Sequence, residues 1–180
     1  MIVSIFDCYF ELSDISRANF TAAELQGSYL HRVKAPKTIF RNAVLTDSDL
    51  SYSNFENSDF EFVSMHGSKL DHSNFSGSNF SRSDLHGVNL KFSNLSNSLL
   101  IGADLRNADL EGVNFEDADL AASIFTEADL DKADFSGANL GSVISGDVSG
   151  SPEALPEGWK LISGYLSIIF IYSFIIIDKN

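Results

Sequence analysis

The chain has 180 residues, 25 of them acidic and 12 lysine or arginine, so its net charge at pH 7 is −13. Binding to nucleic acid or to anionic lipid through basic residues requires a basic surface, and the acidic balance argues against both classes. Apolar residues make up 44% of the chain, which is too many for a disordered acidic tail. The single cysteine, Cys8, excludes an intrachain disulfide framework and a metal site of clustered cysteines.

A five-residue repeat begins near Val3 and keeps its phase to Leu140. Every fifth position from Ile5 to Leu140 is large and apolar except Ala35, the position two before it is small, and the position between is most often Asp or Asn. An α-helix would scatter the large residues around its cylinder, and a continuous strand would flip them between its two faces. A short in–out–in segment followed by a two-residue corner satisfies every position. The repeat therefore predicts a coil with straight sides.

Residue identities recur at a larger step of 20 residues. Phenylalanines share one column and leucines share another, and these residues are predicted to form the structural core: Phe20, Phe40, Phe60, Phe80, Leu50, Leu70, Leu90 and Leu110. Outward asparagines recur at the same step, as a ladder of stacked amides would. The step predicts a four-sided coil of 20 residues, with about seven coils in the array.

The repeat units resemble a known family. Ala103-Asp104-Leu105-Arg106-Asn107 and Ala108-Asp109-Leu110-Glu111-Gly112 are similar to the A(D/N)LXX motif of the pentapeptide repeat proteins, and the match covers residues 3–143. The resemblance implies an all-β fold, a right-handed quadrilateral β-helix. Lys34-Ala35-Pro36 is the weakest unit, and its proline predicts a bulge or a lost ladder bond at that corner.

The sequence predicts three segments: a repeat β-helix over 1–143, an irregular loop or lid over 144–160, and a hydrophobic C-terminal tail over 161–180. Residues 155–166 resemble an LPxGWxLxxGYL segment common in cyanobacterial pentapeptide repeat proteins. Residues 161–177 reach the shortest length of a membrane span. A buried strand or cap over the coil end, a membrane-associating tail and a non-native end are the three alternatives for this stretch. We expect a cytoplasmic location, with any membrane association confined to residues 161–177.

No catalytic, cofactor or metal site is predicted. Most aspartates occupy outward or corner positions, where their carboxylates are expected to accept hydrogen bonds from turn backbone. His66 and His86 should lie side by side, but Arg106 follows in their column and a third zinc ligand is missing. Cys8 occupies an inward small position and is expected to be an inert thiol. We therefore expect neither an enzyme nor a protein that binds nucleic acid directly.

Two surface features are candidates for binding. Columns at the 20-residue step place Arg32, Tyr52, His72 and Phe92 in one corner stripe, although a merely solubilising ladder is an alternative. Residues 104–134 hold ten acidic residues against two basic ones, including Glu111, Glu116 and Asp117. Solubility and protection of the sheet edge are the alternative roles of this acidic belt.

The first hypothesis for function is a non-enzymatic scaffold, a rigid rod whose surface binds an unidentified protein partner. A homodimer through a coil end is a further expectation. The family resemblance implies a second hypothesis, because some members mimic DNA and bind DNA gyrase or topoisomerase. The acidic charge favours that hypothesis, and the lack of inserted loops and of a C-terminal dimerisation helix counts against it. A membrane-tethered rod is the third hypothesis.

Overall fold

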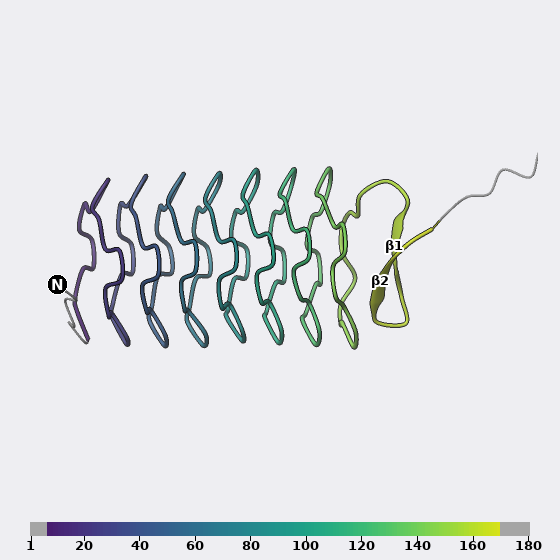
Figure 1. Ribbon diagram of the computed structural model, residues 1–180, viewed down its shortest axis with the longest axis horizontal. Helices are drawn as coiled ribbons and strands as arrows, with labels where there is room; N and C mark the ends of the chain where they lie inside the picture. Colours follow the sequence, from purple (N-terminus) through teal and green to yellow (C-terminus); the bar gives the residue numbers. More distant parts are fainter. Residues whose placement is uncertain (1–6, 170–180) are drawn as a thin grey trace, which may run out of the picture.

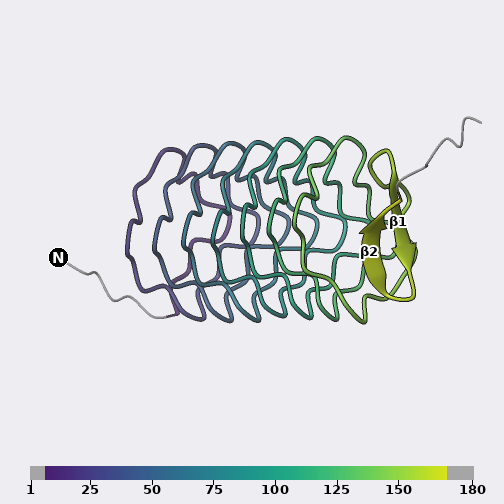
Figure 2. The same cartoon turned by 45° about the vertical axis from the view of Figure 1, so that its right-hand side comes forward.

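The computed structural model describes residues 7–169, which form a column of stacked four-sided coils (Figures 1 and 2). Parallel β-bridges join each outward residue to the residue 20 positions later, from Tyr9 with Tyr29 to Asp134 with Ala154. Bridges recur every five residues, so four fall within each 20-residue step. The described part of the chain contains no helix. The all-β coil predicted from the five- and 20-residue periods is therefore confirmed.

The corners are turns that require a left-handed residue. From Asp7 to Asp147, every fifth residue has a positive φ, between 51° and 70°. In the turn after Leu50, the N–H of Tyr52 donates to the carbonyl of Asp71 in the next coil, at 3.0 Å. Positive φ at the third residue is the signature of a type II turn, which normally favours glycine. Here most of these positions are not glycine, and Tyr52 and Phe62 are among them.

Where the outward residue is Asp or Asn, its side chain closes the corner that follows. Asp49 Oδ1 accepts the backbone N–H of Ser51 at 3.0 Å, and Asn74 Oδ1 accepts that of Ser76 at 3.1 Å. This Asx interaction satisfies the one corner N–H that makes no bond to a neighbouring coil. The preference for Asp and Asn at the outward position follows from this bond.

The large residues point inward and stack between coils. Of the eight core residues predicted above, Phe40, Phe60, Phe80, Leu50, Leu70, Leu90 and Leu110 have no exposed surface. Phe60 stacks on Phe40 with ring centroids 5.1 Å apart and on Phe80 at 4.6 Å. Phe20 is only half-buried, because it lies in the first described coil and stacks on Phe40 from one side.

Buried serines carry a second ladder inside the coil. Ser73 Oγ accepts the N–H of Ser53 at 3.0 Å and donates to the carbonyl of Leu50 at 2.8 Å. Ser93 Oγ does the same for Ser73 and Leu70. A small hydroxyl at this position is therefore the hydrogen-bond partner of an otherwise buried N–H group.

The bulge expected at Pro36 is absent, and that expectation was wrong. Lys34 keeps its bridges to Asp14 and Asn54, and the N–H of Ala35 donates to the carbonyl of Asn54 at 2.7 Å. Pro36 occupies the second position of the turn, which favours proline. In units such as that of Asp49, the N–H at this position binds the Asp or Asn side chain two residues before it, and this unit has Lys34 there. The proline therefore removes no bond that the unit could make.

A hairpin covers the C-terminal end of the column (Figures 1 and 2). Strand β1 (Trp159–Ile162) pairs antiparallel with β2 (Tyr165–Ile168), in a register that sets Leu161 against Leu166. Leu166 is buried against the core, and its N–H donates to Ser145 Oγ at 3.0 Å. The hairpin therefore shields the last apolar layer from solvent.

The segment 144–160, for which the sequence predicts an irregular loop, still contributes to the coil. Ser149 pairs with Asp129 and Ala154 with Asp134. Of the predicted tail 161–180, residues 161–169 complete the hairpin, and residues 170–180 lie outside the described residues. Within the described residues, no helix is long and apolar enough to cross a membrane.

Candidate interaction surface

The structure brings Arg32, Tyr52, His72 and Phe92 together on one corner, and we call these four residues the aromatic corner. All four side chains are exposed, Tyr52 by 50% and Phe92 by 49%. The rings of Tyr52 and His72 stack with centroids 4.7 Å apart and planes 4° from parallel. Phe92 follows at 5.3 Å from His72 in a tilted contact. Consecutive coils thus carry a continuous exposed ring stack.

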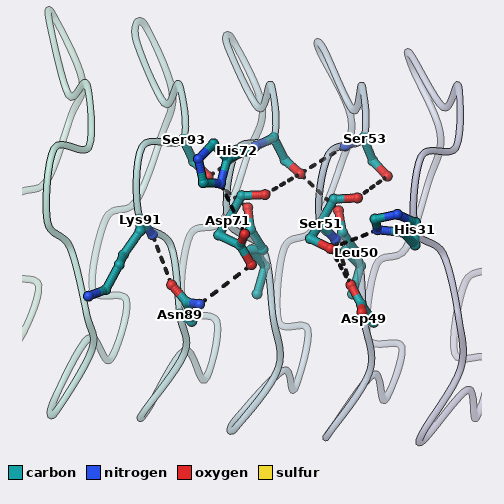
Figure 3. Close-up of polar contacts among 12 residues, drawn as sticks. His31, Asp49, Leu50, Ser51, Ser53, Asp71, His72, Asn89, Lys91 and Ser93 are labelled. Carbon is teal, nitrogen blue, oxygen red and sulfur yellow. Dashed lines mark hydrogen bonds and ion pairs between the residues drawn. The ribbon is translucent and has the colours of Figure 1, made fainter.

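Residues just before the corner brace it, as Figure 3 shows. Asp71 accepts a hydrogen bond from His72 Nδ1 at 3.0 Å and lies 3.4 Å from Asn89 Nδ2. One coil earlier, His31 Nδ1 is hydrogen-bonded to Ser51 Oγ at 2.9 Å, and the ring of His31 meets Tyr52 edge-on. Asp71 thus holds His72, and His31, which is itself hydrogen-bonded to Ser51, packs against Tyr52. Sequence reasoning missed the braces, although they too recur at the 20-residue step.

The stack ends at Gly112 for a steric reason. A Cβ atom at Gly112 would lie 2.6 Å from Cδ1 of Phe92, so the phenyl ring occupies the place of a side chain on the next coil. Asp7 over Gly27 and Asp47 over Gly67 show the same lean of a corner side chain toward the following coil. At Gly27, Gly67 and Gly112 the side chain 20 residues earlier therefore occupies the place of a Cβ atom on the following coil.

The predicted acidic belt divides into paired and unpaired carboxylates. Glu111 lies between two lysines, 3.1 Å from Lys132 Nζ and 3.2 Å from Lys91 Nζ, and the hydrogen bond from Lys132 and then that from Lys91 lower the pKa of its carboxyl. Glu116 and Asp117 are exposed and make no ion pair within residues 7–169. The three residues therefore do not act as one uniform negative surface.

The histidine column has a mixed environment. His66 Nδ1 lies 3.5 Å from Asp84, and Arg106 forms a bidentate pair with Asp104 that lowers the pKa of the Asp104 carboxyl. No group of three or more His, Cys, Asp or Glu side chains that could hold a metal ion occurs in the described part of the chain. Cys8 is half-buried in the first coil, where its N–H donates to Ser28 Oγ.

Two hollows open on the described surface. One of about 310 Å³ lies beside Tyr29, Asp49 and Lys69. The other, of about 450 Å³, is lined by Asp14, Ser16, Arg17, Lys34, Pro36 and Lys37. The second hollow is thus bordered by three basic side chains on an otherwise acidic protein.

The family model for pentapeptide repeats matches this chain in eight copies, over residues 38–77, 64–102, 78–117 and 100–141. The coils have sides of five residues, and the family model matches more than half of the chain. Together, these two findings define the class of protein. The chain belongs to the pentapeptide repeat family.

Solved structures of a resistance protein show the same fold. Two trypsin-treated variants of QnrB1, a plasmid-mediated fluoroquinolone resistance protein, share 20% and 21% identity with this chain. They match 86% and 82% of this chain and 82% of their own, with TM-scores of 0.54 and 0.55. HetL of the cyanobacterium Nostoc sp., a pentapeptide repeat protein involved in heterocyst differentiation regulation, is 19% identical over 91% of this chain and 89% of its own, with a TM-score of 0.46. No protein of curated function matches the chain in sequence.

At these identities the likeness to QnrB1 establishes the fold alone, a right-handed quadrilateral β-helix. The family and fold predicted from the A(D/N)LXX units are thereby confirmed. The number of coils stays a prediction.

Proposed function

We propose that this pentapeptide-repeat rod is a non-enzymatic scaffold that binds another protein through its aromatic corner. The observation that carries the proposal is the exposed stack of Tyr52, His72 and Phe92 on three consecutive coils. Aromatic residues and arginine are enriched in protein interfaces, and Arg32 precedes the three rings in the same stripe.

Rigidity supports this role. The corner residues are held by turn and ladder hydrogen bonds, such as the 2.9 Å bond from the N–H of His72 to the carbonyl of Lys91. Asp71 braces the His72 ring, and the ring of His31, held by Ser51, packs against Tyr52. A surface that is already ordered loses little conformational entropy when a partner binds.

The test compares protein capture by the full chain with capture by the variant Tyr52→Ser/His72→Ser/Phe92→Ser. A matched control removes exposed side chains from another corner, Phe62→Ser/Arg82→Ser, where Arg82 lies 5.6 Å from the Phe62 ring. We expect a captured protein to bind the wild type and the control directly in titration and to bind the aromatic-corner variant at least about tenfold more weakly. Equal binding by all three would contradict the proposal.

A DNA mimic that binds gyrase or topoisomerase is the second candidate. The unpaired carboxylates of Glu116 and Asp117 favour it, and QnrB1, which has the same fold, is a fluoroquinolone resistance protein. Pairing of Glu111 with two lysines weakens it, because a paired carboxylate presents less negative charge to a DNA-binding groove.

Gyrase supercoiling assays with the folded chain decide this second candidate. Inhibition that weakens steeply with added salt, and weakens further in Glu116→Lys/Asp117→Lys, would establish it, since the screening length falls to about 3 Å at 1 M salt. Unchanged supercoiling at large molar excess would exclude it. The membrane-tethered rod and the coil-end homodimer stay hypotheses, and the hairpin already covers the C-terminal coil end.

A further inference from the structure

One side of the rod changes charge along its length. Its outward residues are Asp14, Lys34, Asn54, Asn74, Asn94, Asn114 and Asp134, and we call it the asparagine face. In its middle, Asn74 Nδ2 lies 3.3 Å from Asn54 Oδ1, and Asn94 Nδ2 lies 3.3 Å from Asn74 Oδ1. The aromatic corner borders this face on one edge. On the other edge lies the corner that runs from Arg17 to Gly137.

The N-terminal end of this face is basic. Its first two coils carry Asp14 and Lys34 on the face itself, Arg17 and Lys37 on one edge, and Arg32 on the other. Lys34 pairs with Asp14 at 2.8 Å, whereas Arg17, Arg32 and Lys37 make no ion pair within the described residues. The hollow of about 450 Å³ lies here, between Arg17, Lys34 and Lys37. This end therefore offers unneutralised positive charge around a depression.

The C-terminal end of the same face is acidic. Glu116 and Asp117 occupy the edge corner four coils further along from Pro36 and Lys37, in the same columns. Both side chains are exposed, and neither forms an ion pair in the described part of the chain. The face thus carries unpaired positive charge at one end, asparagine amides along its middle with the exposed carboxylate of Glu56 on one edge, and unpaired negative charge at the other end.

We infer that the asparagine face is a docking site for a second copy of this chain, arranged antiparallel. A two-fold axis across the face at the level of Asn74 sets Lys37 of each copy level with Asp117 of the other. The corner of Glu116 and Asp117 then meets the basic hollow. An interface of this kind is isologous, because the same surface is used by both copies.

The same axis also aligns the other edge of the face. It sets Tyr52 level with Phe92 of the second copy and His72 level with its own counterpart, so the two aromatic corners run alongside one another. The asparagines in the centre can exchange amide hydrogen bonds without burying a charge. At about 0.15 M salt the screening length is about 8 Å, so the negative charge on the remote faces opposes this contact only weakly.

This inference rests on the proposed binding role of the aromatic corner and names its partner as a second copy. The test is sedimentation equilibrium of the full chain at low salt, here about 0.15 M, and at 1 M salt, with the variants Lys37→Glu, Asp117→Lys and the double variant. The corner accepts either charge, because Glu127 and Lys132 occupy equivalent positions with φ of 61° and 57°. Arg82→Glu, which reverses a charge on another corner, is the matched control.

We expect a dimer at low salt that dissociates at 1 M salt. Each single reversal should weaken dimerisation about tenfold or more, since each replaces two attractive pairs by two repulsive ones. The double variant restores both pairs with the signs exchanged and should dimerise nearly as well as the wild type, and Arg82→Glu should leave the dimer unchanged. Far-UV circular dichroism checks that every variant folds.

A chain that is monomeric at low salt and high concentration, or a double variant no better than the single ones, would overturn the inference. If the chain is monomeric and the aromatic-corner variant binds a captured protein more weakly than the wild type does, the dimer is refuted and the proposed function stands. If the double variant restores the dimer, and a captured protein binds the aromatic-corner variant as well as the wild type, the dimer is supported and the proposed function is refuted.

Discussion

Replacing Phe60 by alanine tests the packing of the column most severely. Phe60 has no exposed surface and stacks between Phe40 and Phe80, with Phe55 and Phe75 edge-on at 5.5 and 5.8 Å. The coil ladder holds the backbone on both sides, so the neighbouring rings cannot collapse into the space. We therefore expect Phe60→Ala to lower the free energy of unfolding by about 3–5 kcal/mol.

Phe62→Ala is the matched control, because it removes the same atoms two residues away from an exposed corner. Phe62 is 42% exposed and contacts Arg82 through its ring, so the expected loss is below about 1 kcal/mol. Urea unfolding measures both variants. With an m-value of about 2 kcal/mol/M, Phe60→Ala should shift the midpoint by about 1.5–2.5 M. Similar shifts for the two variants would refute the assignment of inward and outward positions.

Three further changes probe the corners, the serine ladder and the ion pairs. Gly112→Ala should displace the Phe92 ring and lower the thermal midpoint, because the new Cβ would lie 2.6 Å from Cδ1 of that ring. Ser73→Ala should cost about 1–3 kcal/mol in urea unfolding, since the buried N–H of Ser53 loses its hydroxyl partner. Glu111→Gln should lower the thermal midpoint at neutral pH. Because the pKa of the Glu111 carboxyl is lower in the folded chain, its contribution is complete above about pH 4.5 and is lost as the pH falls through the folded pKa.

Each of these changes has a control within the chain. Gly87 has the same φ of 64° as Gly112, but a Cβ atom at Gly87 would meet no other atom within 4 Å, so Gly87→Ala should cost less. Ser83 Oγ donates to the carbonyl of Phe80 and accepts no ladder N–H, so Ser83→Ala should cost less than Ser73→Ala. Glu116 is exposed and makes no ion pair in the described residues, so Glu116→Gln should leave the thermal midpoint at neutral pH nearly unchanged. If a control loses as much stability as the variant it is paired with, the contact on which that variant's prediction rests is contradicted.

The core and the coil could be predicted because they follow from periodicity alone. Inward positions such as Leu50 and Phe60 repeat at five and 20 residues, and a spacing of that kind has one geometric solution. The aromatic corner could be predicted for the same reason, since Tyr52 and Phe92 lie in one 20-residue column. Stacking of Tyr52 on His72 depends on side-chain rotamers, which the spacing does not determine.

Other features could not be predicted because they depend on interactions between coils. Composition gives no sign that Tyr52 and Phe62 adopt left-handed backbone conformations, which a ladder of turn hydrogen bonds imposes on them. Counting charges in residues 104–134 did not show that Glu111 is paired from both sides, by lysines 20 residues before it and 21 after it. The hairpin of β1 and β2 lies outside the repeat, so the five-residue period contains no information about it.

Hydroxyl-radical footprinting of the chain, alone and with a captured protein bound, tests the central claim most directly. The method reports the solvent exposure of individual aromatic side chains, and it should be run below the concentration at which the chain self-associates. We expect the oxidation of Tyr52, His72 and Phe92 to fall together on binding, and that of Phe62 on another corner to stay unchanged. Protection of Phe62 with continued oxidation of the aromatic corner would rule out binding through the aromatic corner.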